Sequence, residues 1–173
     1  MAKKEFVVGV FSDLTQVNET LEALVNAGID KKEIAVVSKL DHPEEELIED
    51  VEIKKANAHA KRWAELGAVS GGLLGLLIGG VIFTAPVAGP VIAAGASLSG
   101  AINGLLGGAV AGGALFGIGD GLIEWGMASE DAKRLEKLVE KGKVLVIVRT
   151  DDAKEAAIEE QMDKTAEKVE VLA

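Results

Sequence analysis

The sequence predicts an α+β protein, a ferredoxin-like split βαβ–βαβ sandwich interrupted by a long, glycine-rich helical hairpin. Each end of the chain reads as strand, helix, strand. The 54 residues from Leu66 to Gly119 contain no charged side chain, although the rest of the chain carries 46. The same stretch holds sixteen of the 21 glycines. We therefore expect residues 1–50 and 142–173 to form one α/β domain, with residues 51–141 inserted between them.

The first half of the α/β domain is expected to be one βαβ unit. Residues 5–11 have the length and the apolar composition of a buried strand. Asp13 then follows as the N-cap of a helix, and Gly28 stands where a glycine closes one. Residues 34–38 read as the second strand.

The second half repeats this plan. Residues 144–148 form an unbroken apolar run, which is typical of a central strand, and residues 168–172 alternate like an edge strand. Thr150 is the expected N-cap of the helix between them. Neither half can bury its sheet alone, so we expect the two halves to pack together as one four-stranded sandwich.

The insertion is expected to contain a transmembrane helical hairpin. Residues 66–85 would make a helix about 30 Å long, which matches the hydrocarbon thickness of a bilayer. Two prolines and a glycine in residues 86–90 break this helix. Residues 91–118 supply a second span that is long enough to tilt. A further helix is expected from Ser129 to about Lys141.

Basic residues flank both ends of the hairpin, while its turn carries no charge. The positive-inside rule therefore predicts a hairpin in the cytoplasmic membrane with both termini in the cytoplasm. Trp63 and Trp125 are the only tryptophans, and they fall near the two ends of the apolar stretch. Because indole rings favour the membrane interface, we expect both side chains to lie there.

The glycines recur every four residues, so each row leaves a groove of bare backbone along one helix face. Small residues let helices approach closely in lipid, where hiding apolar surface adds little. There are more such rows than one helix pair needs, which predicts a homo-oligomer. The expected helix-packing and oligomerisation residues are Gly67, Gly71, Gly75, Gly79, Gly100, Gly104, Gly108, Gly112, Gly113 and Gly117.

Protein could replace lipid around the hairpin. In this alternative, the hairpins of several copies bury one another in a cytoplasmic ring, tube or filament. Such a scaffold would organise or anchor a partner enzyme or a lipid. A soluble monomer is not expected, because the apolar stretch far exceeds what monomers leave exposed.

Enzymatic activity and nucleic-acid binding are not expected. The formal net charge is −10, which leaves no basic face for a phosphate backbone. There is no cysteine, and the two histidines, His42 and His59, read as polar surface residues. Neither a phosphate-binding loop nor a nucleophile elbow occurs. We therefore expect no catalytic residue, no cofactor and no metal.

Four segments carry a resemblance to known proteins. They are Phe6–Phe11, Ala85–Pro90, Gly126–Glu136 and Lys141–Val146. Together with the glycine-rich middle they resemble a bacterial family of general stress or heat-induced stress proteins, whose function is unknown. The resemblance covers nearly the whole chain, and it implies a stress-associated, non-enzymatic, membrane-linked protein.

The leading hypothesis is a structural stress protein whose hairpins self-associate in the lipid bilayer. It would display an acidic α/β domain to the cytosol, where a protein partner could dock. The cytoplasmic scaffold is the alternative. A third hypothesis is a small-molecule or metal sensor built on the α/β domain, with His42 near Glu44, Glu45 and Glu46 as ligands.

Overall fold

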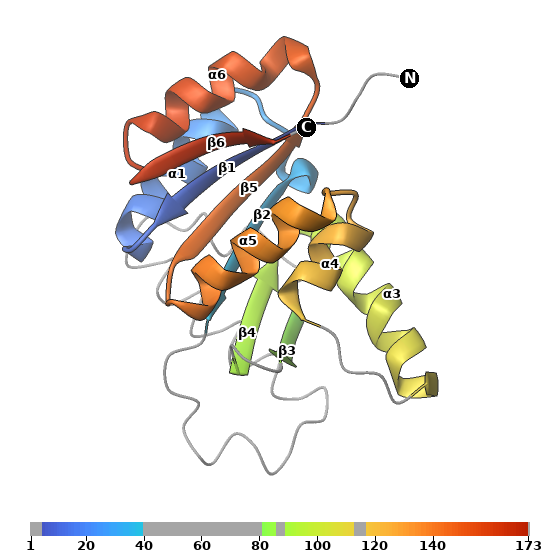
Figure 1. Ribbon diagram of the computed structural model, residues 1–173. Helices are drawn as coiled ribbons and strands as arrows, with labels where there is room; N and C mark the ends of the chain where they lie inside the picture. The colour runs from blue at the N-terminus through green and yellow to red at the C-terminus, as the bar shows by residue number, and fades with distance from the viewer. Residues whose placement is uncertain (1–4, 40–80, 86–88, 113–116, 173) are drawn as a thin grey trace.

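The computed structural model describes residues 5–39, 81–85, 89–112 and 117–172. In these ranges a six-stranded sheet lies between two layers of helices (Figure 1). The elements, in chain order, are β1 Glu5–Phe11, α1 Leu14–Asn26, the short 3-10 helix η1 Lys31–Glu33, β2 Ile34–Lys39, β3 Val81–Ala85, β4 Gly89–Ala94, α3 Ala96–Gly112, α4 Ile118–Glu124, α5 Ser129–Glu140, β5 Val144–Thr150, α6 Asp152–Asp163 and β6 Lys168–Leu172.

Four strands from the two ends of the chain form the middle of the α/β unit, in the order β2-β5-β1-β6. All three pairings are antiparallel; Val8, for example, lies opposite Ile147 of β5 and Glu170 of β6. β1 and β2 are therefore parallel to each other, with β5 between them, which is the split βαβ arrangement. The predicted mixed α/β class and four-stranded core are confirmed, as are the central place of β5 and the edge place of β6.

Helices α1 and α6 cover one face of the sheet. α1 begins as predicted, because the Asp13 side chain accepts a hydrogen bond of 2.7 Å from the backbone N–H of Thr15. It also ends as predicted at Gly28, which has φ +81° and donates its N–H to the carbonyl of Val25. α6 differs by one residue from the prediction, since Asp151 and not Thr150 is its N-cap.

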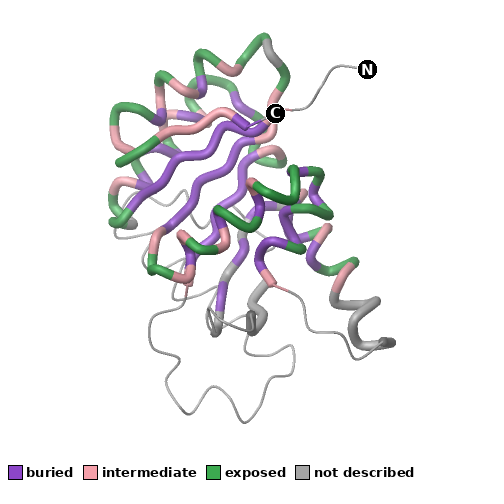
Figure 2. Tube along the Cα trace, viewed as in Figure 1, coloured by how far each residue is buried: buried purple, intermediate pink, exposed green. Residues whose placement is uncertain are grey.

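The core on this face is made of aliphatic, aromatic and methionine side chains from both helices, from the three strands β1, β2 and β5, and from the turn after α1. They are Val7, Phe11, Val17, Leu21, Leu24, Ile29, Ile34, Val36, Val144, Val146, Val148, Ile158 and Met162. Residues of the opposite parity along the strands point to the other face, where they are buried as well. Figure 2 shows the middle strands buried along most of their length. This two-sided burial is why the strands are continuous apolar runs.

The predicted pair of membrane-spanning helices is wrong where the structure describes it. Residues 81–85 were expected to end the first helix, and they form β3 instead. β4 occupies the expected start of the second helix, and it joins β3 to β2 by antiparallel pairing. No helix in the described ranges is long and apolar enough to cross a bilayer. The remainder of the first predicted span, residues 66–80, lies outside the described residues.

The error has a physical reason. An apolar run without polar interruptions has no periodicity, so a buried strand and a buried helix look alike in sequence. Residues 81–83 and 91–92 are β-branched or aromatic, which favours a strand when a sheet edge is there to receive them. The helical part of the predicted second span begins only at Ala96, and α3 ends at Gly112.

Helices α3, α4 and α5 cover the second face of the sheet. This layer and the facing strand residues form the larger core, which comprises Phe6, Val8, Val10, Ala35, Val37, Val91, Ala93, Leu98, Ile102, Ile118, Leu122, Trp125, Met127, Ala132, Leu135, Val139, Leu145, Ile147 and Leu172. The C-terminal part of the charge-free stretch is therefore built into the α/β unit. The predicted helix after Ser129 is confirmed as α5, with Ala128 as its N-cap.

Trp125, which the sequence analysis places at a membrane interface, packs inside the α/β unit in the structure. Its side chain is only 5% exposed, and its ring meets the edge of the Phe6 ring at a centroid distance of 5.5 Å. The guanidinium of Arg149 lies over the same ring, 5.6 Å from the centroid, and its Nε donates to Glu33 at 2.7 Å. The indole thus joins the second helical layer to β1 and β5. Trp63 lies outside the described residues.

A tight turn at Gly95 fixes the start of α3 against β2. Gly95 has φ +119°, and a Cβ at this position would lie 2.9 Å from the Cα of Ala35. Ser97 donates its hydroxyl to the carbonyl of Lys32, and Ser99 donates to the carbonyl of Ala93. Both the backbone conformation and the close approach require glycine here.

Substitution of Gly95 by alanine is expected to lower the free energy of unfolding by roughly 2–5 kcal/mol, because left-handed strain and overpacking add together. The matched control is Gly28→Ala, which has similar strain (φ +81°) but nothing within 4 Å of the new Cβ. Its expected cost is about 1–2 kcal/mol. Urea unfolding followed by circular dichroism measures both. Equal losses in the two variants would show that the contact with β2 is not tight.

Ion pairs tie the edge strand β6 to α5. Arg134 bonds both Glu170 and Asp131, the latter at 3.0 Å, and Lys168 also pairs with Glu170. Burial alone would raise the pKa of Glu170, but the bonds from Lys168 and Arg134 outweigh it and lower that pKa. The pKa of Arg134 is raised by its bonds to Asp131 and Glu170.

The lowered pKa of Glu170 predicts how stability changes in acid. Above the ordinary glutamate value, about 4.3, the carboxylate stabilises the fold fully. This contribution is lost as the pH falls through the lowered pKa, because protonation then breaks the ion pairs. The free energy of unfolding of Glu170→Gln should therefore fall less steeply with pH in that window than that of the unchanged protein. Parallel pH profiles would contradict the prediction.

Candidate self-association surface

α3 has one buried side and one open side. Leu98, Ser99 and Ile102 are buried against the sheet and α4. Gly100 and Gly104 are exposed one helical turn apart, and a Cβ at either position would meet nothing within 4 Å. Asn103, also exposed, lies between them. This side of α3 therefore presents bare backbone to its surroundings.

Glycine is a costly choice at these two positions. In the interior of a helix it destabilises by about 1 kcal/mol relative to alanine, because it loses more backbone freedom on folding. Close packing usually explains such a glycine, but no described residue approaches Gly100 or Gly104. Within the described fold, Gly100 and Gly104 therefore have no packing role.

Gly117 and Gly121, on either side of the end of the charge-free stretch, differ sharply from that pair. Gly121 is buried in α4, and a Cβ there would lie 2.8 Å from Cγ1 of Ile102 on α3. At Gly117 an added Cβ would collide with the carboxylate of Glu136 on α5. Both therefore permit close packing of helices within one chain.

The remaining predicted packing residues are placed only in part. Gly108 and Gly112 continue the four-residue row along the backbone of α3. The glycines of the first predicted span and one of the second lie outside the described residues; they are Gly67, Gly71, Gly75, Gly79 and Gly113. The expected oligomerisation through these rows stays a prediction.

The sheet edge beside α3 is also without charge. β3 is the last strand on this side of the sheet, and no other described strand pairs with its outer edge. Its five residues, Val81–Ala85, include no charged side chain, whereas β6 at the opposite edge carries Lys168 and Glu170. Charged residues on an edge strand discourage pairing with other chains. We call the open side of α3 (Gly100, Asn103 and Gly104) and the β3 edge the charge-free surface.

Groups suited to chemistry do not gather in the parts of the chain that the structure describes. No set of three or more His, Asp or Glu side chains is placed there to hold a metal ion. Asp120, near the end of the charge-free stretch, accepts a bond of 2.8 Å from the backbone N–H of Gly117 at the start of α4. His42 and Glu44–Glu46, the ligands of the sensor hypothesis, lie outside the described residues.

Sequence reasoning missed the position of Arg149, and it assigned the row of Gly117 and Gly121 to contact with another subunit. An arginine directly after the apolar run of β5 signals the end of a buried strand, but not which ring it will cover. The spacing of Gly117 and Gly121 indicates close helix packing. It does not show whether the packed helix comes from the same chain.

Residues 7–86 match the heat induced stress protein YflT domain. Comparison with curated proteins gave no match, nor did comparison with solved structures. The resemblance to a bacterial stress protein family is therefore confirmed over this range. The matched range runs from β1 to the residue after β3, so it takes in the first βαβ unit and the edge strand β3.

Alanine substitutions separate the two kinds of glycine in this region. Gly104→Ala is expected to raise the free energy of unfolding by about 1 kcal/mol in dilute protein, because helix propensity improves and nothing is displaced. Gly121→Ala should lower it by roughly 1–3 kcal/mol, because Ile102 must move. Chemical unfolding at low protein concentration measures both. A destabilised Gly104→Ala variant would show that the open side of α3 is occupied within the chain.

Proposed function

We propose that this protein is a non-catalytic stress protein that self-associates through the charge-free surface and acts as a scaffold. The observation that carries the proposal is the exposed pair Gly100 and Gly104, which costs stability and gains no contact from any described residue. A helix of a second copy lying across this side would make use of the bare backbone. Close approach of two helices is what rows of small residues allow.

The neighbouring edge strand supports the same proposal. β3 offers unpaired backbone groups beside α3, and its residues bring no charge that would have to be desolvated. A copy that covers α3 could pair with this edge at the same time. Water drives such an association, since burial of apolar surface is favourable in water but adds little in lipid.

Association of this kind would respond to conditions that accompany stress. Mass action favours the assembly as the protein accumulates. Apolar burial weakens on cooling, so warming favours the same contacts. A scaffold that assembles when it is abundant and warm suits a protein with a heat-induced stress domain.

Leucine at the two open positions tests the proposal. Gly100→Leu together with Gly104→Leu should block close approach and reduce the size of the assembly in sedimentation velocity without detergent. The fold should persist, because both side chains would point into open space. The control is Asn26→Leu, which adds an apolar side chain at an exposed position on α1 and should leave the size unchanged.

Two results would reject the proposal. One is a protein that sediments as a monomer at every concentration without detergent. The other is an assembly whose size is the same in the leucine variant. Flotation with lipid vesicles forms a second arm of the experiment. If the protein floats with vesicles in place of assembling, lipid and not a second copy covers the surface.

A further inference from the structure

Free lysines and free acidic side chains gather at two separate places on the solvent sides of the two helical layers. Helices α1 and α6, on one face of the sheet, are dominated by acidic residues. Helix α5 and its C-cap, on the other face, present a row of lysines, although α5 also contains Glu130, Asp131, Glu136 and Glu140. The formal net charge of −10 conceals this division, because it averages over the whole chain.

The lysine row consists of Lys133, Lys137 and Lys141, which are all exposed and four residues apart. This spacing places them on one side of α5, away from its buried residues Ala132 and Leu135. No hydrogen bond or ion pair joins any of the three to another described residue. The row is therefore a set of free cationic groups, in contrast to Arg134 beside it.

Acidic side chains occupy the outer side of the opposite layer. α1 contributes Glu19 and Glu22, both exposed, and it contains no basic residue. α6 contributes Glu159, Glu160 and Asp163 near its C-terminal end. Lys164 pairs with Glu160 at 3.5 Å, so most of this charge stays uncompensated. We call these five residues the acidic surface.

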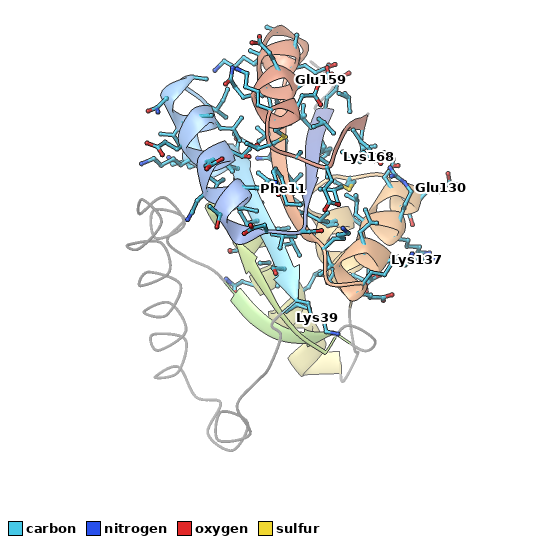
Figure 3. The ribbon with its side chains drawn as sticks, turned by 90° about the vertical axis from the view of Figure 1, so that its left-hand side faces the viewer. Phe11, Lys39, Glu130, Lys137, Glu159 and Lys168 are labelled. Atoms are coloured by element: carbon cyan, nitrogen blue, oxygen red, sulfur yellow. The ribbon has the colours of Figure 1, made fainter. Side chains whose placement is uncertain are left out.

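The two surfaces point in opposite directions. α1 and α6 pack on the sheet face that carries Val7 and Val146, whereas α5 packs on the face that carries Val8 and Leu145. Figure 3 shows Glu130 and Lys137 of α5 extending away from the sheet on one side, with Glu159 on the α6 layer. A copy bound to the lysine row would therefore leave the acidic surface of the first copy free.

We propose that the lysine row of α5 docks on the acidic surface of a second copy of this chain. Complementary charge steers such an encounter and fixes its orientation. Because the interface joins two different surfaces, each bound copy offers the next one the same contact. A heterologous contact of this kind builds a ring if the rotation closes and a filament if it does not.

This contact is separate from the charge-free surface, since it uses no residue of α3 or β3. It goes beyond self-association by assigning a head-to-tail direction to the copies. Exposed charges are screened by salt, so the contact should weaken as ionic strength rises.

Charge reversal on one surface at a time tests the contact. The first variant carries Lys133→Glu, Lys137→Glu and Lys141→Glu; the second carries Glu159→Lys, Glu160→Lys and Asp163→Lys. Each should weaken association on the order of tenfold at low salt, because like charges then face each other. Sedimentation velocity at low protein concentration measures the association, and circular dichroism verifies that each variant is folded.

The combined six-residue variant is the decisive control. It keeps the formal net charge of −10 while reversing the sign of the lysine row and of the α6 part of the acidic surface. Association of this variant should return to near that of the unchanged protein. An equimolar mixture of the two single-surface variants should also associate, because the reversed row of the first variant then faces the new lysines on α6 of the second.

The proposal would be overturned by a combined variant that does not recover, or by association that is insensitive to salt. Binding to vesicles of anionic phospholipid tests whether lipid headgroups, and not a second copy, occupy the lysine row. If the lysine variant loses vesicle binding while its self-association is unchanged, the row binds lipid headgroups and not a second copy. None of these variants alters Gly100 or Gly104, so the outcome is independent of the leucine test of the charge-free surface.

Discussion

Burial of the sheet on both faces is the constraint on which the rest of this structure depends. β1, β2 and β5 carry apolar side chains on each side, so a single layer of helices would leave half of that surface in water. α1 and α6 cover one face, and the insertion supplies α3, α4 and α5 for the other. The insertion is therefore a structural part of the α/β unit, and Trp125 under Arg149 fastens the two together.

For the two ends of the chain, the sequence alone was sufficient to predict the strands and the helices between them. There, polar turns separate the apolar runs, Asp13 and Gly28 mark helix ends by their own chemistry, and the continuity of β5 indicates a central strand. In the middle of the chain these markers are missing. Residues 81–94 contain no charge and no polar alternation, so their pairing with β2 depends on long-range contacts that local pattern does not encode.

The glycines also show that local sequence pattern does not identify long-range contacts. Their spacing correctly indicates close approach, but spacing is blind to the identity of the neighbour. Gly121 meets Ile102 of its own chain, while Gly104 meets none of the residues that the structure describes. The same spacing thus occurs where a glycine packs within the chain and where no described residue approaches it, and only the position of each helix relative to the sheet distinguishes the two cases.

The interleaved strand order has a consequence for synthesis of the chain. β5 pairs with both β1 and β2, yet it begins at Val144, more than one hundred residues after β2 ends at Lys39. A nascent chain on the ribosome would hold β1, β2 and the whole charge-free stretch before the strand that joins them emerges. Native contacts this distant in sequence form slowly, and exposed apolar surface invites association with other chains meanwhile. Synthesis of β5 and β6 therefore decides when this protein can complete its sheet.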